Sequence, residues 1–457
     1  MLQKRNCLCI ILVVILIFTV FNGIDTIVTL AESIIPPVIE SDAAILVDAV
    51  TGQILYGKNE NVQKFPASIT KVMTCVLALE KGGLDNIFEA NAETIDIERN
   101  SSSIGISKGE RFTVEQLLYA TLLVSGNDSA NALGQYVSGD LTSFSALMTQ
   151  RAAEIGCLNT FFWNANGLNY EPEAADKHMT TAYDMALIMK YALSMPKFVE
   201  VISTYRYTIP ATNKYNLIRN CINTNALINK NGEFYYEYCI GGKTGWTTPA
   251  GHTLVTYAEK DGRKLICVTL KGNGRNIAYN DTTKLFKYGF DSFETINLQV
   301  NGKTVNITES DKIIGETNVG IANDATVILP KGFDINNLIV NILSPETVNN
   351  GENINVEVKV SFPENIQLPE GFSRRELEIK GFVGEITYFP PEIPEEPVTQ
   401  LPTDNLDEDI EVEDAKKGVP PILWALIFAI IIAVMIFLRI KQIKRIKKKL
   451  AMRREYK

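Results

Sequence analysis

Ser68 and Lys71 form a Ser-x-x-Lys pattern close behind Pro66. Apolar residues from Ile69 onward recur at the spacing of one helix face, so both side chains belong to the first turn of a predicted helix. Side chains three residues apart lie on the same face of a helix, and Lys71 can therefore reach the Ser68 hydroxyl. A nucleophilic serine needs a neighbouring base, and lysine can supply it. A second copy of the pattern, at 194–197, contains a proline that disfavours such a helix.

Two further motifs accompany this pair. A Ser-Gly-Asn segment at 125–127 falls where the helix predicted after Thr113 should end, and a Lys-Thr-Gly segment at 243–245 precedes a predicted hairpin in a strand position. Without them Ser68 could equally be a helix N-cap beside a solvated lysine, because Ser and Lys are common residues. Together the three motifs indicate acyl transfer through a serine ester.

Other catalytic patterns are weaker. The chain has two histidines, His178 and His252, and both are interpreted as structural, which argues against a Ser-His-Asp or zinc mechanism. Residues 105–109 match Gly-x-Ser-x-Gly, but a nucleophile elbow needs an apolar strand before the serine, and residues 100–103 are polar. We interpret that match as coincidental.

The elements that must position these motifs mix strands and helices. The pattern predicts a buried strand over 43–50, a turn and a returning strand over 53–56. Thr113 and Gln116 predict a capping box for a helix that runs to Val124. An Asp-Gly turn at 261–262 joins the predicted strands 252–258 and 264–270.

Beyond Phe293 the chain alternates apolar and polar residues. Residues 296, 298 and 300 alternate, Asn301-Gly302 predicts a turn, and Val305 and Ile307 alternate back, which predicts a hairpin. The run 354–360 repeats the period of two. A small all-β domain over 293–389 is therefore expected.

Composition places the body of the chain outside the cytoplasm. The 457 residues carry a net charge of -9, which disfavours a nucleic-acid partner, yet the last nineteen residues hold ten Lys/Arg and one Glu. Residues 1–31 have the layout of a signal peptide, with an uncleaved anchor as the alternative. Residues 419–438 lack charges and are long enough to span a bilayer, with a buried core helix as the alternative.

The expected order is thus a signal peptide at 1–31, a catalytic domain at 35–290, the β domain at 293–389, an acidic Pro-rich linker at 390–418, a transmembrane helix at 419–438 and a basic cytoplasmic tail at 439–457. The catalytic domain faces outward on a single C-terminal span. The five cysteines of the body are expected to be buried thiols, since their number is odd and no CxxC occurs.

The sequence also resembles a known family. The stretches AAILVDAVTGQILYGKN, PASITKVMT, TVEQLLYATLLVSGNDSANAL and GGKTGWTTPAGHTLV look like those of low-molecular-mass penicillin-binding proteins, the serine-type D-Ala-D-Ala carboxypeptidases of the peptidase S11 type. The resemblance covers roughly residues 40–390. It implies an α/β fold of the transpeptidase and β-lactamase kind, an antiparallel sheet flanked by helices, with no cofactor or metal.

The resemblance assigns roles residue by residue. Ser68 would attack the carbonyl between two D-alanines, Lys71 would accept its proton, Ser125 would relay a proton to the leaving D-alanine and Asn127 would orient Lys71. The oxyanion hole would be the backbone N–H groups of Ser68 and Trp246. Substrate-binding roles fall to Lys243, Thr244, Gly245, Trp246 and Arg219, the last by likeness to an Asn-Arg-Asn stretch, with a solvated surface arginine as the alternative. A second arginine that the family often carries before the YGF segment has no clean match in this sequence, because Arg275 is close but Ala278 sits nearer the expected spacing.

The function expected is removal of the terminal D-alanine from peptidoglycan stem pentapeptides, with covalent inhibition by β-lactams. A class A β-lactamase is disfavoured, because residues 166–177 offer no convincing Glu-x-x-x-Asn loop for the deacylating water. A muropeptide or β-lactam receptor is disfavoured by the intact catalytic set. Endopeptidase action on cross-links is a variant of the main interpretation.

Overall fold

The computed structural model describes residues 34–168, 177–298 and 302–389. Within these ranges no helix has the length and apolar character needed to cross a bilayer. The expected signal peptide, linker, transmembrane helix and basic tail lie outside the described residues, as does Val300.

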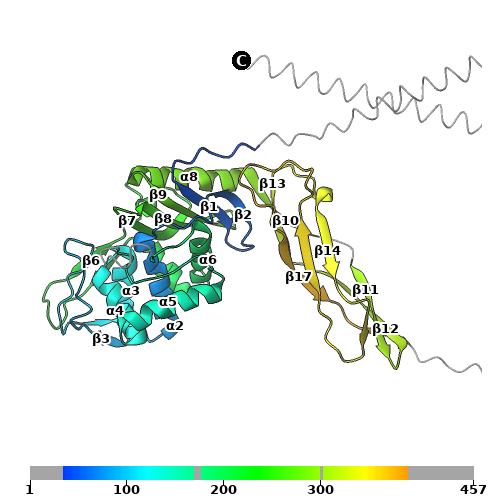
Figure 1. Cartoon of the computed structure of the whole chain (residues 1–457), viewed down its shortest axis with the longest axis horizontal. Coiled ribbons are helices and arrows are strands. Elements are labelled where there is room, and N and C mark those ends of the chain that lie inside the picture. Colours follow the sequence, from blue (N-terminus) through cyan, green and yellow to red (C-terminus); the bar gives the residue numbers. More distant parts are fainter. Residues whose placement is uncertain (1–33, 169–176, 299–301, 390–457) are drawn as a thin grey trace, which may run out of the picture. The chain divides into compact units, whose positions relative to one another are not determined.

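A five-stranded antiparallel sheet forms the centre of the fold (Figure 1). All six residues of β1 are buried, and alternate side chains enter different cores, because successive residues of a strand point to opposite faces. Ala43, Ile45 and Val47 pack in the core shared with most helices, whereas Ala44 and Leu46 pack towards α8. The strand order is β2 (Ile54–Lys58), β1 (Ala43–Asp48), β9 (Arg263–Gly272), β8 (Gly251–Lys260) and β7 (Cys239–Thr247).

Helices cover both faces of this sheet. The predicted capping box is confirmed: Gln116 N donates to Thr113 Oγ1 at the start of α3, and Thr113 N donates back to Gln116 Oε1. The helices are η1 (Ala67–Thr70), α2 (Lys71–Lys81), α3 (Val114–Leu123), α4 (Asn127–Ser138), α5 (Leu141–Ile155), α6 (Ala182–Ala192), α7 (Pro196–Ser203), η3 (Ala226–Ile228) and α8 (Arg275–Ser292). Two short ribbons complete this part, β3 (Ile87–Glu89) with β4 (Arg111–Thr113), and β5 (Arg206–Ile209) with β6 (Arg219–Ile222).

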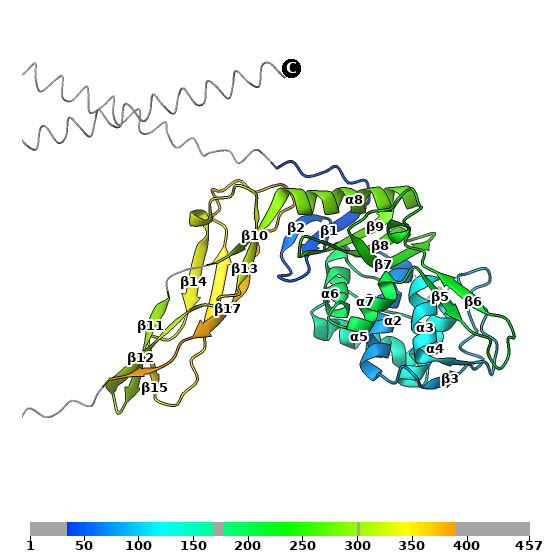
Figure 2. The same cartoon turned by 180° about the vertical axis from the view of Figure 1, so that it is seen from behind.

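Residues from Phe293 onward form strands (Figure 2). A seven-stranded sheet has the order β14-β16-β17-β12-β11-β15, with β18 also paired to β12, and β10 pairs with β13 separately. Val358 and Val360 of the predicted alternating run are fully buried. The strands are β10 (Phe293–Asn297), β11 (Lys303–Glu309), β12 (Lys312–Ile321), β13 (Thr326–Pro330), β14 (Ile339–Leu343), β15 (Thr347–Asn349), β16 (Glu357–Ser361), β17 (Leu377–Val383) and β18 (Thr387–Tyr388), with η4 (Ile335–Asn337) between β13 and β14.

The hairpin predicted around Asn301-Gly302 is wrong. Strand β10 pairs with β13, so that Ile296 lies opposite Val327, and β11 pairs with β12 and β15 instead. Val327 to Leu329 of β13 are buried and offer β10 an apolar partner, and Leu298 N extends this contact by donating to Ala325 O. A local turn signal does not fix the partner when another strand buries more apolar surface.

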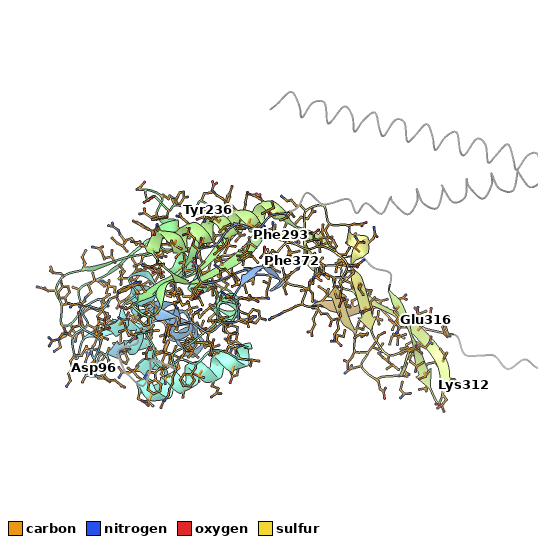
Figure 3. All side chains as sticks on the ribbon, turned by 45° about the horizontal axis from the view of Figure 1, so that its top comes forward. Asp96, Tyr236, Phe293, Lys312, Glu316 and Phe372 are labelled. Atoms are coloured by element: carbon orange, nitrogen blue, oxygen red, sulfur yellow. The ribbon has the colours of Figure 1, made fainter. Side chains whose placement is uncertain are left out.

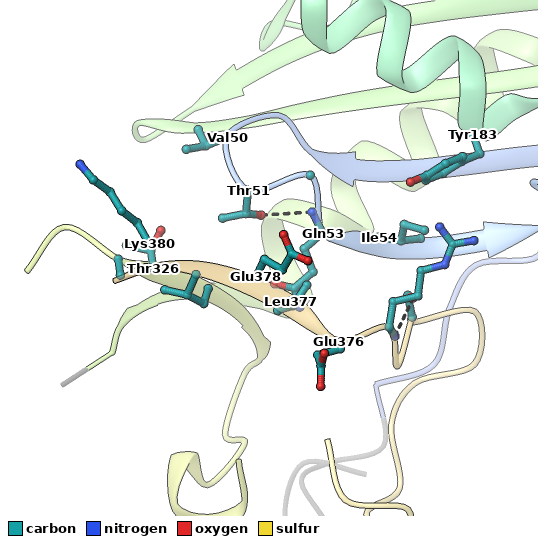
Figure 4. A pocket seen from close by; sticks show the side chains of 15 residues that line it. Val50, Thr51, Gln53, Ile54, Tyr183, Thr326, Glu376, Leu377, Glu378 and Lys380 are labelled. Carbon is teal, nitrogen blue, oxygen red and sulfur yellow. Dashed lines mark hydrogen bonds between the residues drawn. The ribbon is translucent and has the colours of Figure 1, made fainter. Parts of the chain in front are cut away.

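Buried contacts join the turn between β1 and β2 to the β10–β13 pair, within one compact unit that ends at Pro391. The side chain of Gln53 forms two hydrogen bonds with the backbone of Ile328 in β13: Nε2 donates to Ile328 O at 2.6 Å, and Oε1 accepts from Ile328 N at 2.9 Å. The rings of Phe293 and Phe372 stack at 5.6 Å (Figure 3). A crevice of about 480 Å³ runs between turn 50–54 and β17 (Figure 4).

The sequence interpretation of the cysteines is confirmed. Cys75, Cys157, Cys221, Cys239 and Cys267 are all buried free thiols. Burial raises the pKa of each of them.

Candidate active site

The serine of the first motif lies on a strained turn. Ser68 sits in η1 after Ala67, a buried non-glycine residue with φ of +50°. This left-handed conformation is stabilised from outside, because Gly167 packs directly on the Ala67 carbonyl: a Cβ at Gly167 would lie 1.9 Å from that oxygen. Strain of this kind concentrates at functional sites.

Lys71 makes the contacts on which the site depends. Its Nζ lies 2.9 Å from Ser68 Oγ, 2.7 Å from Asn127 Oδ1 and 2.7 Å from the backbone oxygen of Asn166. The last two partners are acceptors and use two N–H groups whatever the charge of the amine. The remaining position on Nζ points towards Ser68 Oγ. It is occupied by a third N–H when Lys71 is an ammonium ion and by a lone pair, which can accept the Ser68 proton, when Lys71 is a neutral amine.

Burial favours the neutral amine. Lys71 is fully buried, and its pKa is lowered well below its usual range, first by desolvation and then by the charge of Lys243. Lys243 is buried as well, and desolvation lowers its pKa to about 7. A lysine with a lowered pKa can act as a general base near neutral pH.

The Ser-Gly-Asn segment forms the turn between α3 and α4. Ser125 has φ of +63° and lies in the same pocket as Ser68, and Asn127 is the first residue of α4. Asp128 holds the preceding loop against this turn, because its carboxylate accepts from the backbone N–H groups of Ile104 and Ile106. The structure thus brings Ser68, Lys71, Ser125 and Asn127 together.

The Lys-Thr-Gly segment lies on β7, at the edge of the sheet and against η1. A Cβ on Gly245 would lie 2.8 Å from Ser68 N and 2.4 Å from Thr253 Oγ1, so only glycine permits this approach. Thr253 Oγ1 in turn donates to Pro66 O at 2.9 Å. The pocket has a volume of about 300 Å³, and Thr244, Gly245 and the exposed Trp246 line it along with Ser68.

Arg219 is not brought to this pocket. Its guanidinium donates to Glu110 Oε1 at 2.8 Å and to Ile104 O at 2.9 Å and lies over the Tyr215 ring, so it is also not a solvated surface group. The residue that does reach the pocket is Thr224, the middle of the segment Asn223-Thr224-Asn225, and it lies beside Thr244. Two asparagines flank Thr224, as two asparagines flank the arginine of the Asn-Arg-Asn stretch. This pattern could have identified the segment from the sequence.

Sequence reasoning assigned no role in the site to three further residues that lie in the pocket or contact the helix turn of Ser68 and Lys71. Arg275, which it left unassigned, lines the pocket with its guanidinium over the Tyr279 ring. Asn166 contributes a backbone oxygen, which leaves no side-chain signature. His178 is fully buried; its Nδ1 accepts from Trp163 N, so Nε2 carries the proton in the contact with Thr70 Oγ1 at 2.8 Å.

The two coincidental motifs are accounted for. Residues 105–109 lie in a loop without the strand and helix of a nucleophile elbow. In the second Ser-x-x-Lys copy Pro196 begins α7, and Lys197 pairs with Glu115 and Glu200. His252 lies on the pocket wall, 6.3 Å from the Trp246 ring, and desolvation lowers its pKa.

The site holds a serine that is hydrogen-bonded to a buried lysine, an asparagine that accepts from the same lysine, and a Lys-Thr-Gly segment on an edge strand. Together these features define an active-serine enzyme of the penicillin-recognising class. Comparison with known proteins agrees: residues 31–274 match the model of the peptidase S11 family, D-alanyl-D-alanine carboxypeptidase. The chain therefore belongs to this family of serine carboxypeptidases.

Relatives support the assignment. The chain is 32% identical over 270 residues to D-alanyl-D-alanine carboxypeptidase DacF of Bacillus subtilis, a match that covers 58% of this chain and 66% of DacF. It is 32% identical to DacB2 of Mycobacterium tuberculosis, over 54% of this chain and 81% of that protein.

Solved structures agree on the fold. A D-alanyl-D-alanine carboxypeptidase from Mycobacterium tuberculosis aligns with a TM-score of 0.52 at 30% identity, over 57% of this chain and 95% of that one. Penicillin binding protein 5 of Haemophilus influenzae, at 24% identity, aligns with a TM-score of 0.61 over 77% of this chain and 99% of that one. The mixed α/β fold of penicillin-binding proteins is thereby established.

Proposed function

We propose that the enzyme removes the terminal D-alanine of peptidoglycan stem pentapeptides through an acyl-enzyme on Ser68. The observation that carries this proposal is the placement of Lys71, whose Nζ lies 2.9 Å from the Ser68 oxygen while two acceptors hold it there. Neutral Lys71 takes the Ser68 proton as Oγ attacks the carbonyl between the two D-alanines. The backbone N–H groups of Ser68 and Trp246 stabilise the developing oxyanion.

Departure of D-alanine completes acylation. Ser125 passes a proton to the leaving amine, and Lys243 with Thr244 holds the carboxylate of that residue. Water then attacks the ester and regenerates Ser68. A β-lactam carries an equivalent carboxylate and acylates the same serine, so penicillin is a covalent inhibitor. Removal of the terminal D-alanine deprives transpeptidases of their donor and limits cross-linking of the cell wall.

The placement of the enzyme in the cell is part of this proposal. Residues 1–31 direct export and 419–438 anchor the chain, with the catalytic domain 35–290, the small all-β domain 293–389 and the acidic linker 390–418 outside and the basic tail 439–457 inside. The charge asymmetry of the sequence supports this orientation. Membrane fractionation of cells that express the full chain or a chain ending at Gly418 tests it: only the full chain is expected in the membrane.

The catalytic proposal is tested by D-alanine release from a diacyl-Lys-D-Ala-D-Ala tripeptide. Wild type is expected to release D-alanine and to bind labelled penicillin covalently, and Ser68→Ala to do neither. Ser107→Ala, which alters the serine of the coincidental Gly-x-Ser-x-Gly segment, is the matched control and should retain both activities. Release by Ser68→Ala, or none by a folded wild type that penicillin acylates, would contradict the proposal.

A further inference from the structure

Two threonine hydroxyls meet in the wall of the pocket. Thr224 Oγ1 and Thr244 Oγ1 lie 2.8 Å apart, and either oxygen can donate in the absence of substrate. Thr244 belongs to the Lys-Thr-Gly strand β7, whereas Thr224 comes from the segment between β6 and η3. Both residues line the pocket that contains Ser68.

The backbone around Thr224 is held from several sides. Thr224 N donates to Leu123 O at 2.9 Å, and Thr224 O accepts from the Tyr279 hydroxyl at 3.0 Å. Asn223 Nδ2 donates to Ile202 O, and Asn225 Oδ1 accepts from Leu227 N. The side chain of Thr224 is therefore presented to Thr244 by a fixed backbone, which removes most of the entropy cost of the contact.

Hydrogen-bond arithmetic then fixes the direction of the pair in the complex. A carboxylate only accepts hydrogen bonds, so Thr244 must give its single proton to a substrate carboxylate that it binds. Thr244 Oγ1 can then only accept from Thr224, and Thr224 must be the donor. In the described part of the chain Thr224 Oγ1 has Thr244 Oγ1 as its one hydrogen-bond partner, so no other acceptor competes for its proton.

We propose that Thr224 is a specificity-determining residue that acts through Thr244: its hydroxyl donates to Thr244 Oγ1 and so commits the Thr244 proton to the C-terminal carboxylate of the substrate. This inference rests on the proposed carboxypeptidase function. The inference predicts that the enzyme prefers a substrate with a free terminal carboxylate. A hydrogen bond from an oriented donor stabilises an anionic acceptor more than an uncharged terminal amide.

The charges around the pair agree with this assignment. Arg219 is engaged by Glu110 and does not reach the pocket. The side chain that faces Thr244 Oγ1 is the neutral Thr224. Arg275 is the arginine that lines this pocket. At this wall the hydroxyl pair therefore adds direction to the charges of Lys243 and Arg275, where a second guanidinium is missing from the described lining.

The test uses the full chain and two substrates, diacyl-Lys-D-Ala-D-Ala as the free acid and as its C-terminal amide. Thr224→Val keeps the shape of the side chain and removes the hydroxyl, and Thr224→Ser retains the hydroxyl. We expect Thr224→Val to lower kcat/KM for the free acid about tenfold, the upper end of what one neutral hydrogen bond contributes. The ratio of acid to amide turnover should fall by the same factor, and Thr224→Ser should restore most of it.

A double-mutant cycle separates this role from a structural one. In a Thr244→Val background Thr224→Val should change the acid-to-amide ratio less than twofold, since the residue through which it acts is gone. If Thr224→Val slows acid and amide equally, or if the two substitutions lower the ratio independently, the inference is overturned while the proposed function stands. If the folded wild type turns over neither substrate, both are overturned.

Discussion

Replacing Lys243 by methionine should stabilise the folded protein at neutral pH while it removes activity. The Lys243 side chain is almost fully buried, and its Nζ donates to the backbone oxygen of Thr244 at 2.8 Å. Among the described residues no ion pair involves Lys243, so nothing of opposite charge compensates its desolvation. Methionine has a similar length and no charge to bury.

The size of the gain follows from the pKa. Burial lowers the pKa of Lys243 from 10.5 to about 7. One pKa unit corresponds to about 1.4 kcal/mol, so the buried ammonium costs up to about 5 kcal/mol. Local relaxation reduces such penalties, and we expect Lys243→Met to raise the free energy of unfolding by about 2–4 kcal/mol at pH 6.

The sign with pH is fixed by linkage. The unfolded chain keeps the proton on Lys243 up to about pH 10, whereas the folded chain releases it near pH 7. The penalty is therefore fully present below pH 7 and is relieved as the pH rises from 7 to about 10. The advantage of Lys243→Met should be largest in acid and shrink steadily towards alkaline pH.

Urea unfolding between pH 6 and pH 9.5 measures this difference. Lys260→Met on β8 is the control, because Lys260 is partly exposed, lies 3.6 Å from Asp291 and should give a difference that hardly changes over this range. If Lys243→Met is no more stable than wild type at pH 6, or if its advantage is as large at pH 9.5, the reasoning from burial is refuted.

Three further outcomes are expected. Gly245→Ala should lower the rate of Ser68 acylation by labelled penicillin at least 100-fold, because its Cβ would lie 2.8 Å from Ser68 N. Gly262→Ala strains a turn at φ of +77° but meets no atom within 4 Å, so it should cost some stability and leave acylation by the folded protein unchanged. His178→Phe should slow the same acylation more than tenfold, and His178→Gln, which keeps a donor and an acceptor, should recover part of it; equal losses would show that the two hydrogen bonds do not matter. Thr113→Ala should lower the free energy of unfolding by about 1 kcal/mol in thermal melts, and no change would refute the capping role.

Local spacing predicted the parts of the site that depend on one turn of helix. Ser68 and Lys71 lie three residues apart, and their contact follows from helix geometry whatever the rest of the fold does. The capping box at Thr113 is local in the same sense. These features need no knowledge of distant residues.

Features that depend on distant backbone could not be predicted. The backbone oxygen that holds Lys71 belongs to Asn166, and any residue would provide it. Thr224, and not the predicted Arg219, lies beside Thr244. Which of these two residues reaches β7 depends on which of two similar Asn-containing segments the fold brings there. The pairing of β10 with β13 likewise depends on buried surface far along the chain.

The buried thiols have a practical consequence for labelling. A thiolate reacts with maleimides and oxidants, whereas a buried thiol with a raised pKa does not. Because every cysteine in the described part of the chain is a buried thiol of this kind, a single cysteine introduced at an exposed position such as Lys264 would be the one reactive thiol there. Dyes or spin labels could thus report on the catalytic domain without prior removal of its native cysteines.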